Sequence, residues 1–119
     1  MRKKSESSEQ IALVSWAWYQ KRLSLIHYPS ELLRFLNPGQ KIHQLKLGTK
    51  VGMPDLFLFE PRLSYHGLVI EMKSCTGSVT EKQSDWLAYF TCRGYKTAVC
   101  RSFEEAKELI EAYVNYKMG

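Results

Sequence analysis

The sequence predicts an α/β fold in which one β-sheet lies between layers of helices. Helix-like and strand-like segments alternate along the chain, in the order helix, strand, helical turns, strand, strand, helix, strand, helix. The run Leu68-Val69-Ile70 is apolar without interruption, which is typical of a central strand buried on both faces. The chain has 119 residues, 45% hydrophobic and 24% charged, which suits one modest core. We therefore expect a single domain over residues 1–119.

The first expected helix runs from Ser5 to about Arg22. Ser5 or Ser7 would cap its start, and Glu6 and Glu9 suit the positive end of the helix dipole. Apolar side chains recur at helical spacing and predict the stripe that faces the core: Ile11, Val14 and Trp18, widened by Leu13, Trp16 and Ala17.

The segment from Leu25 to Lys50 is harder to interpret. Residues 25–28 form a short strand-like run that Pro29 stops. Residues 30–39 are ambiguous, because Ser30 and Glu31 would begin a helix that Asn37-Pro38-Gly39 would end. Residues 40–47 add a helical turn or two before Gly48. Three lysines crowd this part of the chain: Lys41, Lys46 and Lys50.

Two strands separated by a polar connection follow. Pro54 has no N–H and suits the first residue of an entering strand, which we expect from Asp55 to Phe59. The second strand is expected from Gly67 to Lys73. If the two strands pair as neighbours, the carboxylates of Asp55 and Glu71 meet.

Two further helices begin at capping signals, with a strand from Tyr95 to Arg101 between them. The segments Thr80–Gln83 and Ser102–Glu105 both fit the capping box, and Gly94 suits the left-handed residue after the first of these helices. The last helix has an apolar stripe formed by Phe103, Ala106, Leu109, Ile110, Tyr113 and Val114.

Acidic residues and a lysine at the end of the central strand form a candidate metal site. Side chains two apart on a strand share a face, so Glu71 and Lys73 lie together, and Asp55 joins them from the neighbouring strand. Converging carboxylates repel each other unless a cation lies between them, and Mg²⁺ suits such oxygen ligands. With a lysine to stabilise charge on phosphate, the set predicts metal-dependent phosphodiester hydrolysis. Glu6 could reach the same metal, and Gln83 could bind water or phosphate.

The same residues also have plainer explanations. A Glu-x-Lys triplet by itself usually marks a solvated strand face, and an acid after proline is more often part of a turn than a ligand. Glu6 and Glu9 would favour the helix dipole in any case, and the capping box accounts for Gln83.

Other polar and aromatic residues carry weaker signals. The three lysines would be only a solvated face, but their position just before Asp55 favours contact with a phosphate backbone. Loop or surface positions are expected for the three histidines, His27, His43 and His66, which lack metal-ligand spacing. Core positions rather than base-stacking platforms are expected for Trp16, Trp18 and Trp86.

Composition narrows the classes of partner and compartment. The net charge of +5 favours a polyanionic partner without proving one. No apolar run approaches the roughly 20 residues of a membrane span. The basic N-terminus leads into a polar segment rather than the apolar core of a signal peptide, so we expect a cytosolic protein. Reduced thiols filling apolar space are expected at Cys75, Cys92 and Cys100.

Taken together, the motifs resemble the VRR-NUC family of the PD-(D/E)XK nuclease superfamily. The resemblance extends over nearly the whole chain and is carried by Gly52-Met53-Pro54-Asp55, Glu71-Met72-Lys73, Gln83 with Trp86-Leu87, and Gly94-Tyr95. It implies a restriction-endonuclease-like core, with a central mixed sheet flanked by helices, and a site for Mg²⁺ or Mn²⁺.

The resemblance also implies a role for each site residue. Asp55, Glu71 and the backbone carbonyl of Met72 would be metal ligands, Lys73 the catalytic lysine and Gln83 the motif glutamine. The family's first-helix acid stands four residues before a glutamine, which matches Glu6 with Gln10 and leaves Glu9 open.

The short chain is similar to stand-alone, phage-type members of the family. These are homodimeric enzymes that cut branched DNA such as four-way (Holliday) junctions. The resemblance therefore implies a metal-dependent DNA endonuclease, located in the bacterial host cell if phage-encoded, with DNA contacts at Lys41, Lys46 and Lys50. Three alternatives remain: a flap or restriction-like duplex nuclease, a non-catalytic DNA-binding module of the same fold, or a plain structural domain.

Overall fold

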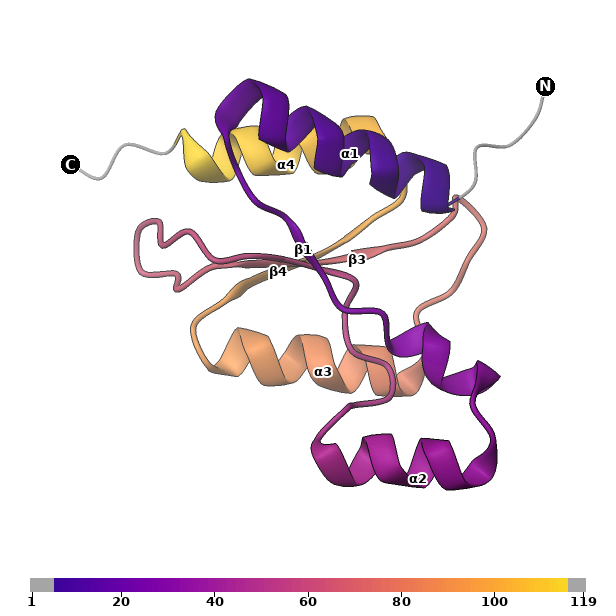
Figure 1. Cartoon of the computed structure of the whole chain (residues 1–119). Coiled ribbons are helices and arrows are strands. Elements are labelled where there is room, and N and C mark those ends of the chain that lie inside the picture. The colour runs from indigo at the N-terminus through magenta and orange to yellow at the C-terminus, as the bar shows by residue number, and fades with distance from the viewer. Residues whose placement is uncertain (1–5, 116–119) are drawn as a thin grey trace.

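The structure is a computed structural model that describes residues 6–115. Its elements, in chain order, are α1 (Glu6–Lys21), β1 (Ile26–His27), the 3-10 helix η1 (Ser30–Phe35), α2 (Pro38–Leu47), β2 (Leu56–Leu58), β3 (Leu68–Met72), α3 (Glu81–Cys92), β4 (Lys96–Cys100) and α4 (Phe103–Val114). One sheet lies between α1 and α4 on one face and α3 on the other, and α2 projects beside α3 (Figure 1). The predicted α/β class is confirmed.

The sheet is mixed and has four strands in the order β1-β2-β3-β4. The pairs β1–β2 and β2–β3 are antiparallel, whereas β3 and β4 are parallel. Every residue of β3 is buried, which confirms it as a central strand. Leu56 pairs with Ile70, so the residue before Leu56 lies opposite the residue after Ile70. This register brings Asp55 to Glu71, as the sequence predicts.

The side chains of β3 divide between the two faces of the sheet. Leu68, Ile70 and Met72 belong to the main core, which α1 and α4 cover. On the other face, Phe57 packs edge-to-face on Phe90 of α3, with ring centroids 5.5 Å apart. Glu71 alternates with Ile70 and Met72 and therefore lies on the α3 face.

The orientation of α1 differs from the predicted apolar stripe. Ile11 is 70% exposed and Trp18 48% exposed, whereas the buried positions are Glu9, Leu13 and Ala17. These three residues are spaced four apart, and the Glu9 carboxylate accepts a hydrogen bond from the Phe103 N–H at the start of α4 (2.7 Å). The contact between α1 and α4 thus selects one of two apolar faces.

Two other details of α1 and its tryptophans also differ from expectation. Ser7 lies inside the helix and so is not its cap, and Ser5 lies outside the described residues. Trp16 packs against the core and Trp86 is partly buried, but the exposure of Trp18 contradicts its expected core position.

The segment around Pro38 lies between two helices, because η1 begins at Ser30 and ends at Phe35, as the sequence suggested, and α2 begins at Pro38. The Asn37 side chain accepts the Gln40 N–H (2.8 Å), and the Gln40 side chain accepts the Asn37 N–H (3.1 Å). This reciprocal pair is a capping box, and Pro38 occupies the first helical position, where its missing N–H costs nothing. The α2 helix that follows has no buried residue.

The later helix boundaries agree better with the sequence. Thr80 and Gln83 form the predicted capping box at α3, and Gly94 after α3 has a φ of +90°. At α4 the Ser102 side chain accepts the Glu105 N–H, but the Glu105 carboxylate accepts the Arg101 N–H in place of the Ser102 N–H. The predicted second capping box is therefore only half formed.

The cysteines and the helix lengths complete the comparison. Cys100 is buried in the core, but Cys75 and Cys92 are exposed, so the prediction that all three fill apolar space is wrong. In the part of the chain from 6 to 115, no helix has both the length and the apolar character needed to cross a membrane.

Candidate active site

Two buried carboxylates meet where β2 begins and β3 ends. Asp55 Oδ2 accepts the backbone N–H of Met72 at 2.8 Å. Glu71 is 1% exposed, and its Oε1 accepts a hydrogen bond from Gln83 Nε2 at 3.3 Å. Lys73 Nζ lies 3.8 Å from the same oxygen. The other oxygen, Glu71 Oε2, is buried and has no hydrogen-bond partner among residues 6–115.

Burial and mutual repulsion make this pair unfavourable in its fully charged form. Burial, followed by the charge of Asp55, raises the pKa of Glu71 to about 9, although Lys73 acts in the opposite direction. Burial also raises the pKa of Asp55, and the hydrogen bond from Met72 opposes that shift. Without a cation, the pair therefore retains a proton at neutral pH.

The residues present fit a divalent metal ion. Glu71 Oε2 is an orphaned buried acceptor, and a hard cation satisfies such an oxygen while relieving the repulsion between the carboxylates. Among residues 6–115, no group of three or more His, Cys, Asp or Glu side chains could hold an ion. Further ligands would have to be a backbone carbonyl, as predicted for Met72, together with water or phosphate oxygens, which is the ligand set that Mg²⁺ commonly takes.

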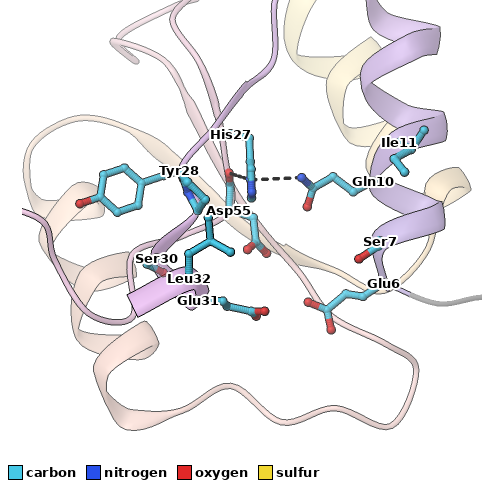
Figure 2. Close-up of a pocket in the computed structure, with 11 residues that line it drawn as sticks. Glu6, Ser7, Gln10, Ile11, His27, Tyr28, Ser30, Glu31, Leu32 and Asp55 are labelled. Carbon is cyan, nitrogen blue, oxygen red and sulfur yellow. Dashed lines mark hydrogen bonds between the residues drawn. The ribbon is translucent and has the colours of Figure 1, made fainter. Parts of the chain in front are cut away.

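A hollow of about 390 Å³ opens beside Asp55, and residues of α1 and η1 line it. Figure 2 shows the carboxylates of Glu6 and Glu31 directed toward each other across it, with Asp55 between their two elements. Burial, then the Asp55 charge, raises the pKa of Glu6. Of the two candidate acids on the first helix, Glu6 thus faces the hollow, whereas Glu9 points to the start of α4.

Two residues of this hollow were not assigned to the site by sequence. The exposed His27 has its Nδ1 3.0 Å from the Asp55 carbonyl oxygen and 3.1 Å from Gln10 Nε2. Glu31 contributes negative charge that raises the pKa of both Glu6 and Asp55. The motif offered no signal for either, because their position depends on β1 pairing with β2 and on where η1 packs.

Backbone close to the motif residues is held by specific contacts. Gly52 has a φ of +75°, and a Cβ there would lie 2.8 Å from Lys82 Cβ, so only glycine fits where this turn meets α3. Arg101 donates from one guanidinium nitrogen to the carbonyl oxygens of Ser74 and Gly77. These contacts fix the turn before Asp55 and the loop after Lys73.

The lysines predicted to contact DNA are all exposed. Lys41 lines a second hollow of about 240 Å³ that Gln83 also lines. Lys46 and Lys50 do not line this hollow.

Comparisons with known proteins agree with this geometry. The model of the VRR-NUC domain matches residues 4–104, most of the chain. A solved structure described as a VRR_NUC domain protein superposes with a TM-score of 0.76 at 24% identity, covering 95% of this chain and 90% of that one, which shows a shared fold. No curated protein matches the chain significantly. The chain therefore belongs to the VRR-NUC family of the PD-(D/E)XK nuclease superfamily, and its function is of the nuclease type, directed at DNA.

Proposed function

We propose that this protein is a Mg²⁺- or Mn²⁺-dependent endodeoxyribonuclease that acts on branched DNA such as four-way junctions. The observation that carries the proposal is the buried acid pair, in which Glu71 Oε2 has no hydrogen-bond partner in the described part of the chain and Lys73 Nζ lies 3.8 Å from the other oxygen. Burying such a pair lowers the free energy of unfolding, and a bound catalytic cation would offset this loss by neutralising the carboxylates.

The carboxylates of Asp55 and Glu71, with the Met72 carbonyl, would hold the metal ion, and Glu6, which lines the same hollow as Asp55, would reach it only through water. When bound, the ion supplies positive charge for the scissile phosphate and lowers the pKa of the attacking water. The Met72 N–H keeps Asp55 oriented by its hydrogen bond. These contacts hold the ligands in place before substrate arrives.

Lys73 and Gln83 have different roles in this proposal. The Lys73 ammonium lies beside the pair, where it can stabilise negative charge that develops on the phosphate during the attack. Gln83 is a positioning residue: its Oε1 accepts the Thr80 N–H at 2.9 Å, and its Nε2 donates to Glu71. The cap of α3 thereby sets the orientation of a catalytic carboxylate.

The choice of branched DNA and a homodimer rests on the likeness to stand-alone members of the family. A symmetric dimer would present two sites to two strands of a junction. Exposed lysines of the α2 region would bind the phosphate backbone: Lys41, Lys46 and Lys50.

A substrate panel tests the proposal. The purified protein is incubated with a four-way junction, a flap and a plain duplex of related sequence, in Mg²⁺, Mn²⁺ or EDTA. We expect metal-dependent cutting of the junction, lost in Glu71→Gln and Lys73→Met and retained in the exposed control Glu104→Gln. Cutting of the duplex alone would favour a restriction-like enzyme. Cleavage of nothing, or equal cleavage by Glu71→Gln, would contradict the proposal.

A further inference from the structure

A basic hollow is lined in part by Gln83, the residue that contacts the buried Glu71. It has a volume of about 240 Å³ and is formed by η1, the start of α2, the turn at Gly52 and the start of α3. Its cationic side chains are Arg34 and Lys41. Gln83 lines the hollow and also donates a hydrogen bond to Glu71. The hollow is thus one side chain away from the candidate catalytic carboxylates.

The positive charges in this hollow are available to a ligand. The Arg34 guanidinium carbon lies 4.8 Å from the centre of the Phe35 ring, which orients it without neutralising it. Neither Arg34 nor Lys41 makes an ion pair with a carboxylate of residues 6–115. Glu31 also lines the hollow, but its carboxylate points toward Glu6 on the other side (Figure 2).

The two hollows adjoin each other and differ in charge. Ser30 and Glu31 line both of them. One contains Glu6 and Asp55, which suit a cation, and the other contains Arg34 and Lys41, which suit an anion. A DNA strand with its scissile phosphate at the buried acids would cross the Ser30–Glu31 segment and bring a neighbouring phosphate to the basic hollow.

We infer that the Arg34–Lys41 hollow is a subsite for a DNA backbone phosphate within three linkages of the scissile one. The inference rests on the proposed nuclease function and adds Arg34 to the substrate contacts. A planar guanidinium binds two phosphate oxygens at once, and a lysine adds a point charge. Binding there would hold the strand in register with the carboxylates, so the two residues position the substrate and do not touch the reacting atoms.

The test neutralises single phosphates in the DNA. A junction is made with one uncharged methylphosphonate at each of the first three linkages on either side of the cut. Each substrate is cleaved by the wild type and by the Arg34→Met/Lys41→Met variant under single-turnover conditions. At one linkage we expect neutralisation to slow the wild type by about tenfold or more and to have no further effect on the variant.

A matched control separates this role from general charge. Arg93 also lies over an aromatic ring, 3.6 Å from the centre of Tyr89, but at the other end of α3, about 15 Å from Gln83 along the helix. Arg93→Met combined with Lys107→Met removes the same charge and should respond to every methylphosphonate as the wild type does. If neutralisation affects the Arg34→Met/Lys41→Met variant and the wild type equally at every linkage, the inference is wrong.

A binding measurement keeps this result distinct from a failure of the nuclease proposal. With the cleavage-deficient Glu71→Gln background, the slope of log Kd against log salt should fall in magnitude by about 1 when Arg34 and Lys41 are replaced, and should not change in the control pair. If replacing Arg34 and Lys41 changes the slope as expected but the wild type cuts no DNA, only the nuclease function is contradicted. If the wild type cuts DNA but replacing Arg34 and Lys41 leaves the slope of log Kd against log salt unchanged, only the subsite is contradicted.

Discussion

The two regions that flank the candidate site differ in burial and in charge. The strands β2 and β3 are buried, and at their paired ends Lys73 lies beside Glu71 while the Met72 N–H holds Asp55. The segment from η1 through α2, residues 30–47, buries only Leu33 among its described side chains and exposes both apolar and basic groups. The first region has its geometry set by packing, and the second leaves its side chains free to adjust.

The difference in burial suits the two regions to different roles: the buried strand ends to catalysis, and the exposed segment to contact with DNA. A catalytic carboxylate gains from a desolvated position in which neighbouring groups fix its orientation and pKa. Contact with a long polyanion needs several exposed cations whose effects add and are screened by salt. We therefore expect substitutions in the first region to act on the rate of the reaction and on stability, and those in the second to act on binding.

The largest contrast should be in cleavage. Glu71→Gln is expected to lower cleavage by at least about 100-fold at any salt concentration, because it removes a charge from the buried pair. Lys46→Gln should raise KM by less than about tenfold, and this effect should shrink as the salt concentration rises, because the one exposed phosphate contact that is lost is screened by salt. Rates for both variants over a range of salt concentrations check this. A salt-sensitive defect in Glu71→Gln would break the comparison.

Stability should separate the two regions next. Ile70→Ala leaves a cavity beneath α1 and α4 and should lower the free energy of unfolding by about 2–5 kcal/mol. Ile42 on α2 is 54% exposed, so Ile42→Ala should change the free energy of unfolding by less than about 0.5 kcal/mol. Urea denaturation measures both. A larger, concentration-dependent loss in Ile42→Ala would show that a second copy covers α2.

Metal binding should stabilise the buried region. An ion that binds only the folded state adds about 2.7 kcal/mol when its concentration is 100 times its Kd. We expect Mg²⁺ or Mn²⁺ to raise the Tm of the wild type, and we expect Glu71→Gln to remove most of that rise. Glu104→Gln, on the exposed start of α4, should retain it. An equal rise in all three proteins would place the ion elsewhere.

A further expected effect is the pH dependence of the stability of the metal-free protein. The pKa of Glu71 is about 9 in the folded state, above its ordinary value of 4.5, so between these values the folded state holds the extra proton. Stability should therefore fall as the pH rises from about 5 toward 9, because deprotonation then favours the unfolded state. Denaturation in EDTA at several pH values measures the slope. Glu71→Gln should flatten it, and an unchanged slope would show that Glu71 does not cause it.

The sequence was most informative where local signals agree with one another. The apolar run of β3, the pairing of β2 with β3 across a polar connection and the capping box at Thr80 each depend on neighbours in sequence, and each is confirmed. Asp55 and Glu71 could be paired because antiparallel neighbours meet in register once the strands are identified. The Asn37-Pro38-Gly39 segment shows the limit of local sequence signals, because the same residues are compatible with the end of one helix and with the start of the next.

Residues brought to the site by distant elements could not be inferred in this way. Sequence spacing centred the buried face of α1 on Ile11, Val14 and Trp18 and placed Leu13 and Ala17 at its margin, but in the structure Leu13 and Ala17 are the buried centre, while Ile11 and Trp18 are exposed. That rotation also directs Glu9 to α4 and leaves Glu6 over the hollow. The choice depends on which of two apolar faces finds a partner, and this information is not contained in α1 itself.

The sequence by itself determined the α/β class, the central strand, and the acid pair with its lysine, because these follow from periodicity and from the cost of burying like charges. Only the tertiary structure decided the rotation of α1, the arrival of His27 and Glu31 beside Asp55, and the basic hollow next to Gln83. These features depend on the packing of elements that are far apart in the chain. The free energy of that packing depends on how the two surfaces fit each other, which neither segment shows by itself.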